Sequence, residues 1–347
     1  MTKSETTSPT VAIESVMISC TIDAMEGRDV ATVDIPGAFM QTEQEGTVHV
    51  RLEGVMVKQL LKIDRDKYEK YIRWHNNKPI LYVRLKKALY GTLQAAMLFW
   101  KDLSSKLQEW GFSINPYDWC VANKLINGKQ CTVLWHVDDL KISHVDGDVV
   151  SDIINKLDKE YGKVTPLTIT RGKVHEYLGM TIDFNKPRKV QIIMLKYVEE
   201  LLNEMPDSMQ GKAVTPAAQH LFQTNNNSSL LEADEKEFFH TTTAKLLFLS
   251  KRARPDLQTA ISFLCTRVQA PDLDDYKKLA RVIRYLRATK EIPLTLEGDS
   301  INILKWYVGS SFAIHNDMKG HTGAYFTLGK GGVISSSART KLSDTVK

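Results

Sequence analysis

Cysteine, long apolar segments and a strong excess of charge of one sign are all scarce in this sequence. The four cysteines are scattered over 347 residues and form no CxxC pair; they are Cys20, Cys120, Cys131 and Cys265. This spacing indicates neither a disulfide framework nor a zinc knuckle. We therefore expect an intracellular protein in a reducing compartment.

Segments directed to membranes are lacking as well. No stretch approaches the run of about 18 apolar residues that a membrane-spanning helix needs. The first ten residues, MTKSETTSPT, are polar and lack the apolar centre of a secretory signal. The sequence also shows no internal repeat. We expect no membrane partner.

The remaining composition is that of an ordinary globular protein, with 43% hydrophobic and 25% charged residues. A chain of this length can form two or three packed units. The net charge of +5 and the isoelectric point near 8.8 are mildly basic. Such a balance permits a nucleic-acid partner but does not require one.

Apolar patterning predicts an α+β fold with a largely antiparallel sheet backed by helices. Helices and strands alternate without the regular rhythm of a parallel sheet. Strands are expected within 28–40, 47–57, 80–91, 121–143 and 175–195, and helices over 93–112 and 148–162. The Asn127-Gly128 pair predicts a hairpin between two of these strands.

Residues 206–236 differ from their surroundings because they are polar and rich in turn-forming residues. We interpret this segment as a long connector between two units. Residues 237–290 are helical by pattern, and 301–347 return to strand-like alternation. The expected units are 1–205, the connector 206–236, a helical unit 237–295 and a C-terminal unit 296–347.

Three aspartates stand where a buried strand would be expected. Asp34 ends an apolar strand, and Asp138-Asp139 interrupt another, VLWHVDDLKI. An unpaired carboxylate is costly to bury, and a hairpin turn would present the pair at its tip. Carboxylates gathered there suit Mg²⁺. Two such ions can activate a 3′-hydroxyl and neutralise a departing pyrophosphate.

Taken alone, these residues have commoner interpretations. An Asp-Asp pair near a strand is more often a solvated turn, and an aspartate at a strand end is more often a helix N-cap. The surrounding sequence, however, resembles copia-type retrotransposon reverse transcriptases. The resembling segments follow the family's order: VDIPGAFMQ, LKKALYGTLQAAMLFW, WHVDDLKISH, YLGMTIDF, KRARPDLQTAISFL and DDYKKLARVIRYLRAT.

The resemblance extends from about residue 8 to the C-terminus. It implies a right-hand polymerase palm with partial fingers over 1–205, a helical thumb over 237–295 and a truncated ribonuclease H-like segment over 296–347. The implied activity is RNA-directed DNA synthesis by two-metal nucleotidyl transfer. The implied partners are an RNA template, a DNA primer, their RNA–DNA duplex, a dNTP and the remainder of a Gag-Pol polyprotein. The implied location is the cytoplasm, in virus-like particles, or the nucleus.

The resemblance also assigns roles at the metal site. Asp34 would bind both ions, Mg²⁺ or Mn²⁺, and the Ile35 carbonyl would be an additional ligand. Asp138 would complete the site and Asp139 would support it. Phe39 would be the steric gate that excludes a ribose 2′-hydroxyl, although it can also be a core aromatic residue that follows a turn.

Further roles follow for the substrates. Gly91 and Gln94 would line the nucleotide pocket and contact the templating strand, and Leu178 and Gly179 would form the primer grip. His136 departs from the tyrosine or phenylalanine that most reverse transcriptases have at this position. For His136 we favour packing beside the primer over metal ligation.

A basic stripe is predicted on the helix within 274–289. Its cations would contact a nucleic-acid backbone without reading sequence; they are Lys277, Arg281, Arg284 and Arg287. The alternative is an ordinary solvated face. Lys251, Arg252 and Arg254 would add to the positive field if they lie nearby.

Two features of the family are missing or altered. The family places a basic fingers segment ahead of the motif at Ser8-Pro9-Thr10, and without it we expect weakened nucleotide binding. Gly309 stands where the family's ribonuclease H segment has an aspartate, so we expect ribonuclease H activity to be absent.

Two further functions are weighed against the polymerase. A non-catalytic, nucleic-acid-binding relic or domesticated fragment is the alternative, and retention of the site residues disfavours it. An unrelated two-metal nuclease is disfavoured by the primer-grip and thumb motifs.

Overall fold

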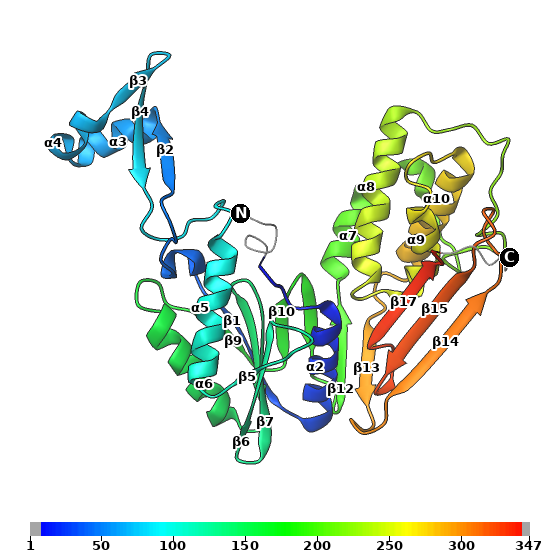
Figure 1. The fold of residues 1–347 in the computed structure, drawn as a ribbon. Helices are drawn as coiled ribbons and strands as arrows, with labels where there is room; N and C mark the ends of the chain where they lie inside the picture. Colours follow the sequence, from blue (N-terminus) through cyan, green and yellow to red (C-terminus); the bar gives the residue numbers. More distant parts are fainter. Residues whose placement is uncertain (1–7, 342–347) are drawn as a thin grey trace.

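The computed structural model describes residues 8–341, which form a mixed α+β fold built on antiparallel sheets (Figure 1). The predicted fold class is confirmed at this level. The four cysteines are free. No helix of the described chain is long and apolar enough to cross a membrane.

The largest sheet has six strands in the order β5-β6-β7-β8-β1-β9. Its strands are β1 (Asp29–Asp34), β5 (Ser113–Ile114), β6 (Val121–Ile126), β7 (Lys129–His136), β8 (Asp139–His144) and β9 (Thr168–Arg171). Strand β1 is buried on both faces between its ends, which explains its continuous apolar run. Helix α6 (Gly147–Tyr161) packs on β1 and β8, and helix α5 (Ala95–Glu109) packs on β5. This sheet positions the candidate site.

Several local predictions are confirmed. Asn127 and Gly128 both have positive φ, 51° and 73°, and they join Ile126 to its partner Lys129 in a two-residue hairpin. The helices predicted over 93–112 and 148–162 are α5 and α6. Gly111 follows the first of these helices with φ of 85° and ends it as expected.

Two predicted strands are wrong in part. The segment 47–57 forms strand β2 (His49–Glu53), but Gly54 at φ 54° then starts helix α3 (Val55–Ile63). The segment 175–184, one strand by its apolar pattern but a primer-grip hairpin by the family resemblance, is a hairpin of β10 (Val174–Tyr177) and β11 (Met180–Asp183), and β11 pairs with the next strand as predicted. In both places the apolar alternation continues through a backbone turn, so periodicity alone does not reveal the break.

A small unit projects from the rest of the chain, on the upper left of Figure 1. It contains a three-stranded sheet in the order β2-β4-β3, with helix α3 packed on β2 and β4. Its further elements are α4 (Arg65–Tyr68), η2 (Glu69–Tyr71), β3 (Arg73–His75) and β4 (Lys78–Arg84).

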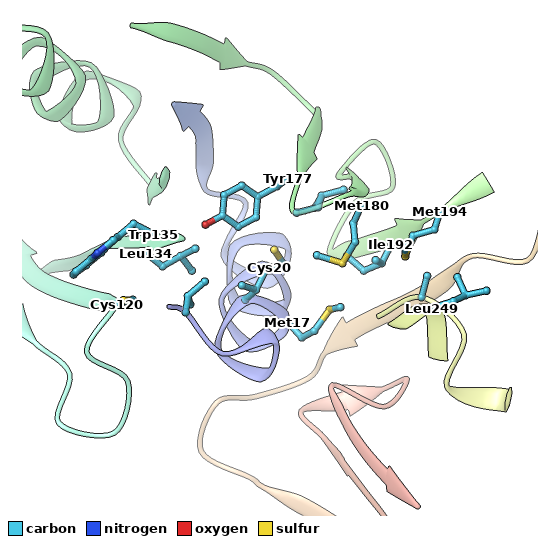
Figure 2. Packing of buried hydrophobic residues seen from close by; sticks show 14 of the residues in the cluster. Met17, Cys20, Cys120, Leu134, Trp135, Tyr177, Met180, Ile192, Met194 and Leu249 are labelled. Atoms are coloured by element: carbon cyan, nitrogen blue, oxygen red, sulfur yellow. The ribbon is translucent and has the colours of Figure 1, made fainter. Parts of the chain in front are cut away.

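A five-stranded sheet, β10-β11-β12-β13-β16, joins distant parts of the chain. Its further strands are β12 (Lys189–Ile193), β13 (Leu294–Gly298) and β16 (Gly329–Lys330). Strand β13 crosses the expected boundary between residues 295 and 296 and pairs with β12. Figure 2 shows Tyr177, Met180 and Ile192 of this sheet in one apolar cluster with Met17 and Cys20 of helix α2 (Ile13–Glu26).

Residues 195–288 contain helices and no named strand, and the helical character predicted for 237–290 is confirmed. Their helices are α7 (Leu195–Asn203), η3 (Asp207–Met209), α8 (Ala233–Ser250), η4 (Pro255–Leu257), α9 (Gln258–Cys265) and α10 (Leu273–Ala288). The connector 206–236 ends inside the first turn of α8 and packs against α10. The Leu231 N–H donates to the Pro271 carbonyl at 3.0 Å, and Leu221 and Leu231 are buried.

The last sheet has the order β14-β15-β17 and contacts α9 through β17. Its strands are β14 (Lys305–Ser311), β15 (His321–Thr327) and β17 (Ile334–Arg339). The strand-like character predicted for 301–347 is thus found as far as Arg339, the end of β17. Residues 1–7 and 342–347, which belong to the first and last expected units, lie outside the described chain.

Candidate active site

Three aspartates meet at one end of the large sheet. Asp34, the last residue of β1, pairs directly with Asp139, the first residue of β8. Asp138 occupies the two-residue turn between β7 and β8, where His136 pairs with Asp139. The Ile35 N–H donates to the Asp138 carbonyl at 3.2 Å and ties the turn to the end of β1. The strand pairing therefore brings together residues about 100 positions apart in the chain. Periodicity in the sequence cannot predict a contact over that separation.

The turn that carries Asp138 is strained. Val137 has φ of 60°, a left-handed conformation that costs a side-chain-bearing residue about 1–2 kcal/mol and is rare for a β-branched one. Such strain persists only where surrounding structure imposes it, and it concentrates at functional sites. The hydrogen bond from Ile35 and the flanking strand pairs hold the turn in this shape.

The carboxylates repel one another. Burial, and then the charge of Asp138, raise the pKa of Asp34 above its ordinary value. The pKa of Asp139 is raised by burial and by both other aspartates, while His136 lowers it. None of the three forms an ion pair with a lysine or arginine within residues 8–341. A divalent cation would relieve this repulsion, which makes the cluster a candidate metal site.

The donor set fits Mg²⁺ or Mn²⁺, because it consists of carboxylate oxygens. As the described side chains are arranged, no group of three or more His, Cys, Asp or Glu residues is close enough to hold an ion. Gathering the three carboxylates around one therefore requires side-chain movement. The Ile35 carbonyl accepts a hydrogen bond from the Ala38 N–H at 3.2 Å and retains a second lone pair for a ligand.

Phe39 lies one short turn beyond Asp34, in the 3-10 helix η1 (Ala38–Gln41). Gly37, at φ 64°, turns the chain so that this helix can start. The Phe39 side chain is only 8% exposed, with its ring centroid 4.2 Å from that of Tyr90 and 6.5 Å from that of Phe99. The residue thus belongs to the core and lies beside the aspartates as well.

Tyr90 is a site residue that sequence reasoning missed. Its hydroxyl donates to Asp138 Oδ2 at 2.9 Å, and the side chain is half exposed. Burial and this hydrogen bond raise the pKa of Tyr90 to about 12. In the sequence, only its position inside a family motif could have indicated a role for Tyr90. A single tyrosine in a loop belongs to no periodic pattern.

Gly91 and Gln94 follow in the same loop. Gly91 has φ of 90°, which a residue with a side chain adopts only with strain. Gln94 is the N-cap residue of α5, and its side-chain oxygen accepts a hydrogen bond from Gln44 Nε2 at 3.3 Å. The loop places both residues next to Tyr90 in the chain.

The predicted primer grip is the turn of the β10–β11 hairpin. Leu178 and Gly179 have φ of 51° and 76°, the positive values at both central positions that a type I′ turn requires. Tyr177, just before the turn, donates from its hydroxyl to the Asp139 carbonyl at 3.3 Å. A cavity of about 140 Å³ is lined by residues of this hairpin and of the strands that carry Asp34 and Asp139. The hairpin therefore reaches the aspartates.

Glu176 and Tyr177 line this cavity and were not identified from the sequence. His136 lies opposite Asp139, and its Nδ1 atom is buried without a hydrogen-bond partner among residues 8–341. Packing of His136 beside the primer stays a prediction.

The basic residues of α10 do not form one open stripe. Arg281 donates to Thr215 Oγ1 at 2.9 Å, and Arg284 donates to the Ser208 and Gln210 carbonyls, each at 2.8 Å. All three acceptors belong to the connector. A cavity of about 280 Å³ between connector and helix has several cations in its lining, namely Lys212, Lys277, Lys278, Arg281 and Arg284.

Lys277 is exposed, whereas Arg287 is half buried and has two guanidinium nitrogens without partners in the described structure. The expectation that Arg254 adds to a surface field is wrong. It is 2% exposed and engaged by Asp256 and Thr289. Arg252 lies over the Phe248 ring at 3.6 Å, and Lys251 is exposed.

Gly309 lies in the middle of β14, opposite Gly323. A Cβ atom added there would meet nothing within 4 Å. Packing therefore does not exclude a larger residue at this position.

Taken together, an antiparallel sheet, a carboxylate-bearing hairpin and a neighbouring cluster of aromatic rings define a protein with a candidate metal-dependent active site. A family model described as reverse transcriptase (RNA-dependent DNA polymerase) matches residues 2–218. The chain belongs to this family, and the predicted copia-type retrotransposon reverse transcriptase region is confirmed.

Transposon proteins are among the similar sequences. A Ty5-1 transposon protein of Saccharomyces cerevisiae is 22% identical over 72% of this chain and 79% of its own length. The Pol polyproteins of transposon TNT 1-94 from Nicotiana tabacum and RE2 from Arabidopsis thaliana are each 24% identical, over 94% and 97% of this chain. The chain spans only 23% and 21% of those polyproteins.

Among solved structures, a telomerase from Candida tropicalis is similar with a TM-score of 0.31 and 10% identity. The match covers 52% of this chain and 39% of the telomerase. This likeness is too weak to support any inference.

Proposed function

We propose that the chain is the polymerase region of a retrotransposon reverse transcriptase and synthesises DNA on an RNA template. The observation that best supports this proposal is that Asp34, Asp138 and Asp139 lie together at one end of the sheet. All three belong to the segment that the family model matches. In the reaction, the primer 3′-oxygen forms a bond to the α-phosphorus of a dNTP while the bond to pyrophosphate breaks.

The aspartates would act by holding divalent cations. Two bound Mg²⁺ or Mn²⁺ ions supply activation of the 3′-hydroxyl and neutralisation of the leaving group. Asp34 and Asp138 would hold them, the Ile35 carbonyl would add a ligand, and Asp139 would support the cluster from across the sheet. The fixed β1–β8 register keeps Asp34 and Asp139 at one place throughout the reaction.

The neighbouring residues would position the substrates. The Phe39 ring, which packs against Phe99, would exclude a ribose 2′-hydroxyl by shape. Gly91 and Gln94 would contact the nucleotide and the templating base. The Leu178-Gly179 turn, which reaches the aspartates through Tyr177, would hold the primer end.

The larger architecture would then be a polymerase hand. The six-stranded sheet would be the palm, the projecting β2-β4-β3 unit part of the fingers, and α8, α9 and α10 the thumb. Lys277 and its cationic neighbours on α10 would contact the phosphates of an RNA–DNA duplex. We propose that the protein acts as a portion of a Gag-Pol polyprotein, because its Pol relatives extend well beyond the region that it matches. Such a protein would be located in the cytoplasm, in virus-like particles, or in the nucleus.

The C-terminal sheet would be the start of a ribonuclease H-like segment without ribonuclease H activity. Gly309 supplies no carboxylate on β14, although the space around it is open. Packing around position 309 therefore does not explain the glycine, and without an acid there the segment lacks a ligand for the ribonuclease H metals.

Extension of a DNA primer on an RNA template tests the polymerase. We expect extension by the wild-type chain with Mg²⁺ or Mn²⁺ and none by Asp138→Asn. If neither protein extends the primer while both bind the duplex, the polymerase is wrong and a non-catalytic nucleic-acid-binding relic is supported.

A further inference from the structure

Tyr90 makes two contacts that converge on the candidate nucleotide pocket. Its ring lies against Phe39, with centroids 4.2 Å apart and planes 35° from parallel. Its hydroxyl donates to Asp138 Oδ2 at 2.9 Å. One side chain thus covers the proposed sugar gate and occupies an oxygen of the proposed metal ligand.

We propose that Tyr90 is a latch on the nucleotide pocket, which must leave Asp138 and Phe39 before a metal-bound deoxynucleotide can bind. The inference rests on the proposed function, because it takes Asp138 as a metal ligand and Phe39 as the sugar gate. Tyr90 is on this account a specificity-determining residue of the same site.

The contact with Asp138 competes with the metal. The hydroxyl hydrogen points at Oδ2, and a cation cannot bind the same lone pair at the same time. A hydrogen bond to an ionised carboxylate is among the stronger ones in proteins. A cation that binds Asp138 on the side that Tyr90 occupies must therefore replace this bond, and this competition lowers the apparent affinity for the ion.

The contact with Phe39 competes with the sugar. A centroid separation of 4.2 Å is close to van der Waals contact, so no sugar fits between the two rings. With Tyr90 in place, Phe39 is only 8% exposed. Tyr90 must therefore move away from Phe39 before the sugar of a nucleotide can contact the Phe39 ring.

The segment around Tyr90 is built to let the side chain leave. Tyr90 is 50% exposed, and its neighbours Leu89 and Leu93 are exposed as well. The Ala88 N–H donates to the Thr42 carbonyl at 3.1 Å and fixes the chain before the tyrosine. Helix α5 fixes it again from Ala95. Between these anchors, rotation of one half-exposed side chain suffices to open the pocket.

Binding of Mn²⁺ alone, measured by electron paramagnetic resonance of the free ion, tests the competition for Asp138. We expect Tyr90→Phe to bind Mn²⁺ about 3- to 10-fold more tightly than wild type, since one hydrogen bond to the ligand is gone. Tyr117→Phe is the matched control because Tyr117 is 97% exposed. Unchanged or weaker binding by Tyr90→Phe overturns the latch.

A second variant tests the contact with Phe39. Tyr90→Leu should bind a dNTP more tightly than wild type on a primer–template whose primer end lacks a 3′-hydroxyl, where no chemistry occurs. Weaker dNTP binding would show that Tyr90 is a permanent wall of the pocket, which contradicts a latch. Thermal melting of both variants checks that they are folded.

The same titrations separate the two levels of inference. If wild type and Asp138→Asn bind Mn²⁺ equally, the proposed metal site fails, and the latch fails with it. If Asp138→Asn loses binding but Tyr90→Phe matches wild type, the metal site stands and only the latch is wrong.

Discussion

Asp34 and Asp139 face each other across neighbouring strands as a directly opposed pair of carboxylates. The pKa of each is raised first by burial and then by its carboxylate neighbours. Such an arrangement is unfavourable to folding by itself, so a metal ligand role accounts for it better than a structural one. The strained Val137 turn has the same implication.

Replacing Phe39 tests the sugar gate. We expect Phe39→Val to raise ribonucleotide incorporation relative to deoxynucleotide incorporation by about tenfold, because the smaller side chain no longer fills the space of a 2′-hydroxyl. The ratio of kcat/KM for the two nucleotides measures the change. An unchanged ratio in a folded variant would show that Phe39 is only a core aromatic residue.

Among single residues, the three aspartates could be predicted from the sequence, but the tyrosines that contact them could not. Asp34, Asp138 and Asp139 stand out because charge interrupts apolar strands and the neighbouring motifs are specific. Tyr90 and Tyr177 carry no such contrast, since tyrosines in loops and strands are ordinary. Their roles arise from contacts 38 to 48 residues apart in the chain, which no local pattern encodes.

Among the elements, helix α2 is tied to strand β8 by a buried ion pair. Lys141 Nζ bonds the Asp23 carboxylate and, at 2.9 Å, Ser19 Oγ. Lys141 and Asp23 are each 1% exposed. Because β8 begins with Asp139, the pair connects the candidate site's strand to the helix on which the second sheet packs.

Breaking that pair should be costly. We expect Lys141→Ala to lower the free energy of unfolding by about 3 kcal/mol, because the buried Asp23 carboxylate then retains only Arg28, whose Nη1 lies 3.8 Å from its Oδ1. Lys156→Ala, which removes an exposed i,i+4 pair with Asp152, should cost less than about 1 kcal/mol. Denaturant unfolding measures both, and equal costs would contradict the assigned role of the buried pair.

A histidine pair should make stability depend on pH. His315 Nε2 and His321 Nδ1 lie 3.1 Å apart, and both side chains pack on Phe222 of the connector. Burial lowers the pKa of both residues, helped by Arg339 for His315 and by His315 for His321. The folded state therefore binds fewer protons than the unfolded state. Stability from the pair is complete above about pH 6.5 and is lost as the pH falls below it.

The fall in Tm between pH 7 and pH 5 measures this effect. His321→Gln keeps hydrogen-bonding groups but cannot titrate, so the fall should be smaller in this variant than in wild type. If Tm falls by the same amount in both proteins, the histidine pair does not cause the pH dependence of stability.

Local chemistry also decided which elements could be predicted. The Asn127-Gly128 hairpin was predictable because both residues favour positive φ. The Leu178-Gly179 turn has the same geometry with a leucine in the first position, so the apolar pattern alone suggests one strand and only the family resemblance indicates the hairpin. Here the pairing of β10 with β11 determines the backbone, against the preference of the residue.

For the molecule as a whole, the connector determines which cations of helix α10 remain available to a partner. Arg281 and Arg284 are engaged by connector residues, whereas Lys277 is exposed. A helical-wheel argument places these cations on one face but says nothing of what covers it. Likewise, the pairing of β13 with β12 joins sequence units that composition alone separates.

The salt dependence of duplex binding tests the proposed thumb. We expect Lys277→Gln to reduce the slope of log K against log salt by about 1, as the loss of one phosphate contact would. Lys156→Gln on α6 is the control and should leave the slope unchanged. If the two variants have the same slope, Lys277 does not contact the duplex.

Incorporation of a single deoxynucleotide on an RNA template tests the central claim most directly. With Mg²⁺ or Mn²⁺ present, the account predicts incorporation by wild type and by Tyr117→Phe. It predicts none by Asp34→Asn or Asp138→Asn, each folded and still bound to the duplex. Incorporation by either aspartate variant at the wild-type rate would contradict the account, because the three carboxylates would then not be the catalytic centre.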